Sequence, residues 1–161
     1  MTAALSPHPA SAGARRGALA GLAATAPMTG VMLLLHRLLP GYQRYPLEPY
    51  RITTRLARRL HLSRYLDDQA GRVAATTVAH FGYGAAAGAL FPPLTQRLPV
   101  PGVLAGLVYG LLVWAGSYLG LVPALGLLSP ATQQPARRNA LMIAAHLVWG
   151  AALGLLAGRR A

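Results

Sequence analysis

The sequence predicts an all-α integral membrane protein with four transmembrane helices. Only 11% of the 161 residues are charged, whereas soluble domains carry about 25%. The charges leave four windows without any Asp, Glu, Lys or Arg, at 17–36, 73–96, 98–136 and 139–158. Each window is at least as long as the roughly 20 apolar residues that a membrane-spanning helix needs. Helices of a soluble bundle need charged outer faces, which these windows do not provide.

An internal repeat divides the predicted spans into two pairs. The spans are expected at about 17–39, 73–94, 102–122 and 139–157, within a domain of residues 17–158. HFGYGAAAGAL (80–90) matches HLVWGAALGLL (146–156), which pairs the second span with the fourth. GALAGL (17–22) matches GVLAGL (102–107), which pairs the first span with the third. Paired spans are separated by two crossings and run in the same direction. We therefore predict a duplicated two-helix hairpin, a parallel repeat about an axis along the membrane normal.

Glycine recurs at four-residue spacing in every predicted span. The residues are Gly17/Gly21, Gly84/Gly88, Gly102/Gly106/Gly110, Gly116/Gly120 and Gly150/Gly154/Gly158. In lipid, small residues at this spacing allow two helix backbones to approach closely. The pattern predicts tight helix packing and says little about function.

The connection between the first two spans is the most polar part of the chain. Within it, residues 51–66 predict a basic amphipathic helix. Its apolar residues are Ile52, Leu56 and Leu60, and its arginines on the other sides are Arg51, Arg55, Arg58 and Arg59. Two placements remain open. The helix lies in the headgroup plane, where the arginines bind anionic lipid headgroups, or it folds back over the bundle as a cap.

The distribution of arginine predicts the orientation in the membrane. All 15 basic residues are Arg; ten lie in the connections at 37–72 and 123–138, and five lie in the terminal segments and the 95–101 connection. By the positive-inside rule, loop 40–71 is expected in the cytoplasm and both termini outside. Residues 1–16, rich in Ser, Pro and Ala, are expected to form a disordered N-terminal tail.

The repeated motif places a histidine at the same position of the second and fourth spans. His80 and His146 each follow an arginine by eight residues, and the glycines four and eight residues later turn both rings toward the packing side of the helix. Thr29 and Trp114 are expected at a similar depth, and His36 at the cytoplasmic end of the first span. These five residues form the candidate site.

Two interpretations of the histidines remain open. As a pseudo-symmetric pair, His80 and His146 would hold a b-type haem by bis-His ligation, bind a metal together with His36, or hydrogen-bond a quinone. Alternatively, each ring donates to a backbone carbonyl or a Ser/Thr hydroxyl of a neighbouring helix. Duplication explains the symmetry without a ligand, and close glycine packing leaves little room for a macrocycle. We therefore expect structural histidines and no bound cofactor or metal.

The composition excludes several function classes. The absence of Cys excludes disulfides, iron–sulfur clusters and c-type haem attachment. The only carboxylates are Glu48, Asp67 and Asp68, all in the connecting loop, so no intramembrane acid is available for a proton relay or a Ser-His-Asp triad. The arginines flank apolar windows, which indicates lipid headgroups rather than nucleic acid as the partner. An enzyme is not expected.

Four segments cover most of residues 17–157: GLAATAPMTGVMLLLHRLLP, YPLEPYRITTRLARRL, HFGYGAAAGAL and HLVWGAALGLL. Together they resemble the small bacterial inner-membrane proteins related to YagU. The resemblance implies a four-helix inner-membrane protein, no established enzymatic activity and a loose association with stress or acid tolerance. It supplies no catalytic residues.

The sequence therefore predicts a non-enzymatic membrane protein, either an accessory subunit of a membrane complex or a protein of envelope homeostasis. Its partners would be the bilayer, anionic headgroups and other membrane-protein subunits. The alternative is a small protein that binds haem, metal or quinone through His80 and His146. A transporter for a small solute is a weaker alternative, because the spans lack carboxylates for ion coupling.

Overall fold

The computed structural model describes residues 9–95 and 97–158, and this part of the chain is helical with turns and no strand. The long helices are α1 (Pro9–Arg37), α3 (Gln69–Thr95), α4 (Gly102–Ala115) and α6 (Ala136–Ala157). The shorter elements are α2 (Glu48–Arg59), α5 (Val122–Ala124) and the turns η1 (Gly41–Gln43), η2 (Ser63–Tyr65), η3 (Gly116–Leu121) and η4 (Ala131–Gln133). The prediction of an all-α protein is confirmed.

The first helix is longer at its N-terminal end than the sequence predicted. α1 begins at Pro9, so residues 9–16 are helical and do not form the expected disordered tail; residues 1–8 lie outside the described part. Tertiary contacts extend the helix. Gly17 lies directly against the ring of Pro92 in α3, and Arg16 Nη2 donates to the carbonyl of Leu156 in α6 at 3.2 Å. Local sequence alone does not reveal such contacts.

The predicted amphipathic helix is shifted toward the N-terminus. α2 covers Glu48–Arg59 instead of 51–66. Pro49 occupies its first turn, where a missing N–H and a fixed φ are tolerated. The helix ends before His61, whose φ of 56° is left-handed and cannot continue a right-handed helix. The expected third and fourth turns are therefore replaced by a bend and the short η2 turn.

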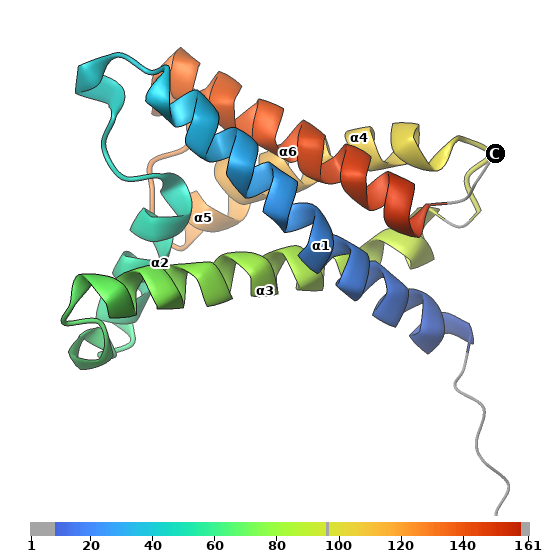
Figure 1. Ribbon diagram of the computed structural model, residues 1–161, viewed down its shortest axis with the longest axis horizontal. Helices are drawn as coiled ribbons and strands as arrows, with labels where there is room; N and C mark the ends of the chain where they lie inside the picture. The colour runs from blue at the N-terminus through green and yellow to red at the C-terminus, as the bar shows by residue number, and fades with distance from the viewer. Residues whose placement is uncertain (1–8, 96, 159–161) are drawn as a thin grey trace, which may run out of the picture.

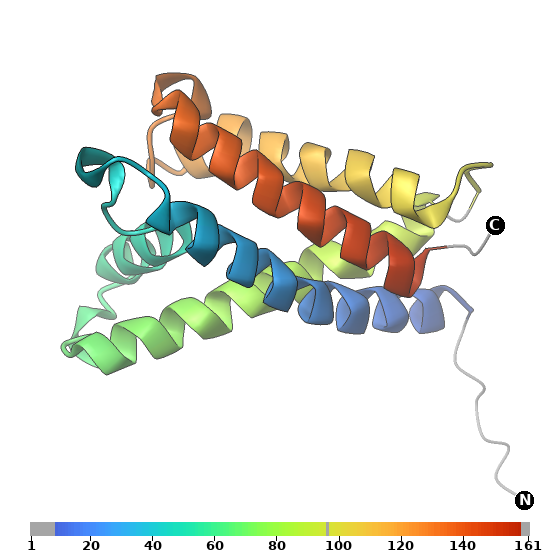
Figure 2. The same cartoon turned by 45° about the horizontal axis from the view of Figure 1, so that its top comes forward.

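Two helix pairs form the body of the molecule. α1 packs along α3, α4 packs along α6, and α1 also packs against α6. α1 and α4 run in one direction, and α3 and α6 run in the other (Figure 1). Figure 2 shows the start of α1, the α3–α4 connection and the end of α6 at one end of the molecule, with the two longer connections at the other.

The two pairs diverge toward the end that carries the longer connections. There α3 separates from α4 and α6, and α2 lies between α3 and α5 (Figure 1). Next to this divergence the pairs are joined by hydrogen bonds across the bundle. Tyr109 donates its hydroxyl to the carbonyl of Ala87 at 2.7 Å, and Trp149 Nε1 donates to the carbonyl of Gly21 at 3.1 Å.

Glycine allows the closest helix contacts in both pairs. A Cβ added at Gly21 would overlap the carbonyl oxygen of Gly84, and one at Gly150 would overlap that of Gly106. Gly17 stands in the same relation to Gly88, as does Gly154 to Gly102. Backbones come this close only where both surfaces lack side chains. Among the described residues, five other glycines face open space instead: Gly30, Gly41, Gly82, Gly116 and Gly120. Within the described part of the chain, the close packing expected at the Gly116/Gly120 pair is therefore not seen.

The outer surface of the helices is strongly apolar. Large hydrophobic side chains are exposed along all four long helices, among them Leu19, Leu34, Val78, Leu90, Leu104, Leu112 and Leu155. Within residues 9–95 and 97–158, three helical stretches are long and apolar enough to cross a membrane: Ser11–Arg37, Gly102–Ala124 and Ala136–Ala157. α3 has the required length but carries more polar side chains.

Candidate ligand-binding cavity

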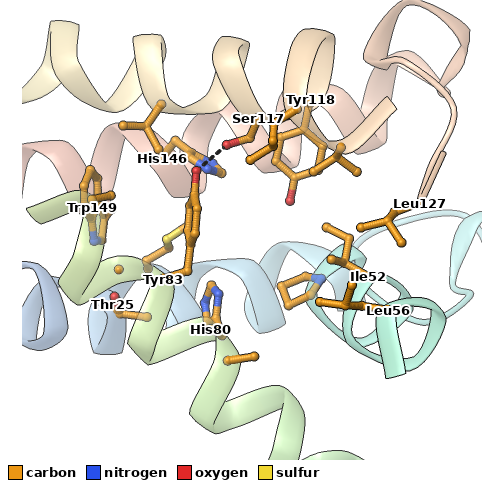
Figure 3. A pocket seen from close by; sticks show the side chains of 18 of the residues that line it. Thr25, Ile52, Leu56, His80, Tyr83, Ser117, Tyr118, Leu127, His146 and Trp149 are labelled. Carbon is orange, nitrogen blue, oxygen red and sulfur yellow. Dashed lines mark hydrogen bonds between the residues drawn. The ribbon is translucent and has the colours of Figure 1, made fainter. Parts of the chain in front are cut away.

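A cavity of about 280 Å³ occupies the space where the helix pairs diverge. Its walls come from α1, α2, α3, the end of α4, the η3–α5 segment with the turn that follows, and α6 (Figure 3). Most of the lining is aliphatic, including Met28, Ile52, Leu56, Val113 and Leu127. The volume lies just below the range of about 300–1,000 Å³ that is usual for small-ligand pockets. The cavity therefore suits a small and largely apolar molecule.

A π-helical turn builds one wall of the cavity. Pro123 has no N–H to donate to the carbonyl of Leu119, so a regular α-helix is interrupted at this point. The chain instead forms the wider turn η3, from which Ser117 and Tyr118 line the cavity. The hydroxyls of Tyr83 in α3 and Ser117 lie 2.7 Å apart and connect the two walls (Figure 3). Such turns frequently occur at functional sites.

Both candidate histidines line this one cavity from different helices. His146 is buried in α6, and its Nδ1 lies 2.7 Å from the carbonyl oxygen of Met142. The rings of His146 and Tyr118 pack edge to face, with their centres 5.8 Å apart. His80 lies in α3, and its Nε2 is buried without a hydrogen-bond partner. The expected interhelical hydrogen bonds are therefore not formed. The bond of His146 stays within its own helix, and the Nε2 of His80 faces no hydrogen-bonding group of the chain.

The other three candidate residues lie outside the cavity. His36 Nε2 lies 3.1 Å from the carbonyl of Tyr45, at the loop end of α1. Thr29 donates its hydroxyl to the carbonyl of Thr25 one turn earlier. The indole N–H of Trp114 is buried without a partner. Across the described residues, no three His, Cys, Asp or Glu side chains form a group that could hold a metal. His36 therefore does not join His80 and His146 in the cavity, as the metal-binding alternative requires.

Sequence reasoning missed several residues that line the cavity. They are Thr25, Tyr83, Ser117, Tyr118 and Trp149. A signal for two of them was present, because Tyr83 and Trp149 occupy the aromatic position of the repeated His-x-x-aromatic motif. Nothing comparable marked Ser117 and Tyr118, whose orientation depends on the π turn.

A second polar cluster lies at the loop end, around Arg138. This arginine, eight residues before His146, is 2% exposed and forms an ion pair of 2.6 Å with buried Glu48. Its Nε and Nη2 both donate to Oε1 of Glu48, at 3.0 and 2.6 Å. The remaining N–H groups reach the carbonyls of Gln43, Tyr45 and Pro46, at 2.7, 3.1 and 3.2 Å. All five donors of the guanidinium are therefore used.

This cluster positions α2 over the cavity. Glu48 is the first residue of α2, and the carbonyls bound by Arg138 belong to the segment that precedes it. The guanidinium carbon of Arg138 also lies 3.8 Å from the centre of the Tyr45 ring. The sequence placed Arg138 only as a residue flanking a span and Glu48 only in a loop. The structure makes them a buried pair that fixes α2 to the start of α6.

The arginines of α2 were expected at lipid headgroups, and the structure gives two of them acceptors within the chain. Arg55 Nη1 donates to the carbonyl of Leu127 at 2.5 Å, and Arg59 donates to the carbonyls of Leu125 and Gly126. Arg51 lies 5.0 Å from the centre of the Tyr45 ring, and Arg58 is exposed. The apolar side of α2 packs through Ile52 on the Val122–Leu128 region. This arrangement corresponds to the cap among the two placements that the sequence left open.

The fold and the cavity together define the class of protein: an all-helical protein with apolar helices suited to a membrane and a small apolar cavity between them. The chain belongs to the family described as "Protein of unknown function (DUF1440)", which matches residues 56–155. This confirms the expected membership of an uncharacterised family, and the specific relation to YagU stays a prediction. Neither the curated proteins nor the solved structures contain a match to the chain.

Proposed function

We propose that the protein is a non-enzymatic, four-span protein of the bacterial inner membrane that binds a small lipophilic molecule. The observation that carries this proposal is the cavity of about 280 Å³ between the helix pairs, with its predominantly aliphatic lining. Apolar pockets with a few convergent polar groups are the usual form of small-molecule sites. The lining has few polar groups and no carboxylate, which disfavours an ion or a strongly polar solute and with it the transporter alternative.

Two observations support α3 as the fourth span. Its outer side carries exposed apolar residues along its length, including Val73, Val78, Leu90 and Leu94. It also has the length, because its 27 residues correspond to about 40 Å of helix. Its polar side chains gather toward the cavity and the loop end. We therefore count α3 among the spans.

The glycine contacts support a duplicated hairpin. Gly21 meets Gly84 in the first pair, and Gly106 meets Gly150 in the second. These residues correspond under the repeat that the sequence indicates. The same holds for Gly17 with Gly88 and for Gly102 with Gly154, so the two pairs are built from equivalent contacts.

The opening of the cavity indicates where the molecule enters. Several lining residues are also exposed on the outer surface, namely Leu56, Ala79, Tyr83, Leu121 and Leu125. These side chains belong to surfaces that would face lipid when the helices span the bilayer. A lipid-soluble molecule would therefore enter sideways from the membrane. Such loading suits an accessory protein that holds a membrane-dissolved compound.

Haem and catalysis are less well supported. The volume of the cavity favours a single ring or a short acyl segment over a porphyrin. Among the carboxylates, Glu48 is already paired with Arg138, and Asp67 and Asp68 are exposed at the loop end. No acid is therefore available to the histidines of the cavity.

Blocking the mouth of the cavity tests the proposal. Ala79 is exposed and borders the cavity, so Ala79→Phe places a ring in the opening without disturbing the bundle. Ala74→Phe, on an exposed position of the same helix away from the cavity, is the matched control. Each protein is purified in mild detergent, extracted with organic solvent, and the extract is analysed by mass spectrometry.

We expect one lipophilic compound at close to one molecule per chain in the parent and in Ala74→Phe, and its loss in Ala79→Phe. Equal retention of every lipid species by the three proteins would overturn the proposal, because the compounds would then be bound to the outer surface.

A further inference from the structure

The cavity presents two hydrogen-bonding points on opposite walls. Figure 3 shows His80 on α3 at one side and His146 on α6 at the other, with the Tyr83 side chain beside them. The Nε2 of His80 is buried and has no partner. A buried polar atom without a partner loses the hydrogen bonds it makes in water, which is unfavourable unless a ligand replaces them. A ligand in the cavity could therefore supply the hydrogen-bond partner that Nε2 of His80 lacks.

The hydrogen bond of His146 determines what its other nitrogen offers. The carbonyl of Met142 can only accept, so Nδ1 of His146 must carry the proton that makes this 2.7 Å contact. In the neutral ring the second nitrogen, Nε2, then holds a lone pair and accepts. A ligand oxygen at His146 must consequently be a hydroxyl that donates, because a carbonyl oxygen there would face another acceptor.

The remaining polar groups of the cavity further limit which ligand can fit it. Tyr83 and Ser117 are already bonded to each other, whereas the hydroxyl of Tyr118 points into the space between α2 and α3 (Figure 3). Between the polar points the lining is aliphatic or aromatic, with Met28, Val113 and Trp149. A flat ring with an oxygen at each end satisfies these requirements. It fills a small apolar space and carries polar groups only where the walls are polar.

We propose that the cavity binds a single-ring quinol or related phenol, with a ring hydroxyl donating to Nε2 of His146 and a second oxygen accepting from Nε2 of His80. This inference rests on the proposed function and names the chemistry of its ligand. The cavity should also prefer the reduced form of the ligand. The quinol has the hydroxyl donor that His146 requires, and the oxidised quinone does not.

The test compares tert-butylhydroquinone with tert-butylbenzoquinone, added anaerobically to the full-length protein in lipid nanodiscs. Calorimetric titration gives each dissociation constant after subtraction of empty nanodiscs. The chain has no Cys and no Lys, so the quinone has no side-chain thiol or primary amine to modify. We expect the quinol to bind about tenfold more tightly, since a buried acceptor facing another acceptor forfeits its hydrogen bond.

Variants show whether the preference comes from the assigned atom. His146→Phe keeps a ring against Tyr118 but removes the acceptor, so the ratio of the two affinities should fall to about one. Thr29→Val removes a hydroxyl at a similar depth but outside the cavity, and should keep the tenfold ratio. Equal binding of quinol and quinone by the parent, or an unchanged ratio in His146→Phe, would overturn the inference.

A ring-free probe separates this inference from the proposed function. If 1-decanol binds and Ala79→Phe prevents it while neither ring compound binds, the ligand class is wrong and the lipophilic site stands. If Ala79→Phe changes the binding of none of the three probes, both the ligand class and the proposed site fail.

Discussion

At the scale of single residues, the most constrained position is Arg138. Its guanidinium is buried, and every N–H has an acceptor, one of them the carboxylate of Glu48. A buried ion pair gains little overall stability, because desolvation of both charges offsets their attraction. Removing one partner is a different matter, because the other charge then remains buried and unpaired. Replacing either residue of the pair alone should therefore strongly destabilise the fold.

We expect Arg138→Met to lower the free energy of unfolding by about 3–5 kcal/mol. The variant leaves Glu48 and the carbonyls of Gln43 and Pro46 without the donors that Arg138 supplies. Thermal unfolding in detergent, followed by circular dichroism, measures the change. Arg137→Met is the matched control. Arg137 is next to Arg138 in the sequence but is exposed, so its replacement should hardly change the free energy of unfolding.

The double variant Arg138→Met/Glu48→Met distinguishes a lost pair from a lost charge. It should be more stable than Arg138→Met alone, since no unpaired carboxylate remains. If Arg137→Met and Arg138→Met unfold at the same temperature, the assigned role of Arg138 is wrong.

At the scale of elements, the helix pairs depend on glycine at particular positions and not on glycine in general. α3 contains both kinds. Gly88 lies against the backbone of Gly17 and Gly21 in α1, whereas nothing lies within 4 Å of a Cβ added at Gly82. Glycines at four-residue spacing make such close backbone contacts in α1, α3, α4 and α6. In η3, nothing lies within 4 Å of a Cβ added at Gly116 or Gly120.

Gly88→Ala should destabilise the protein by about 1–3 kcal/mol, as overpacking of a close contact does. Its new methyl group would overlap the carbonyl oxygen of Gly17, and neither backbone can move independently. Gly82→Ala in the same helix should be neutral or slightly stabilising, because Ala favours the helix and meets open space. Reversible unfolding in detergent micelles compares the two. A loss of the same size in both variants would show that helix packing is not the cause.

At the scale of the whole molecule, two tightly packed pairs diverge at one end and enclose a cavity. α2 lies in the space between them, held by Glu48 at its start and by Arg55 and Arg59 along its length. The arginine-rich connection is therefore part of the folded body. The positive-inside rule counts arginines near the ends of the spans, whether they contact lipid or the protein. The end of the molecule with the arginine-rich connection is therefore still expected in the cytoplasm.

The orientation can be tested with single cysteines, since the chain contains none. Ser63→Cys lies on an exposed turn at the arginine-rich end, and Val100→Cys lies in the exposed α3–α4 connection at the other end. In intact cells, an impermeant maleimide should label Val100→Cys and spare Ser63→Cys. After permeabilisation both should react. Labelling of Ser63→Cys alone in intact cells would reverse the orientation.

The sequence by itself determined the helical class, the long helices and the glycines at which the pairs meet. These features follow from local rules, because an apolar stretch of sufficient length and a four-residue spacing of small residues need no distant partner to be recognised. The sequence also indicated that His80 and His146 belong together, since both copies of the repeat place the ring on the packing side.

Only the tertiary structure decided how these parts form a site. The cavity exists because the helix pairs diverge, and that divergence depends on contacts between segments far apart in the chain. The pairing of Arg138 with Glu48 joins residues 90 positions apart, so no local pattern could reveal it. Pro123 interrupts the regular helix locally, but the structure was needed to show that the π turn brings Ser117 and Tyr118 to the cavity. The sequence could indicate His80 and His146, but the cavity between them is formed only when the helices pack.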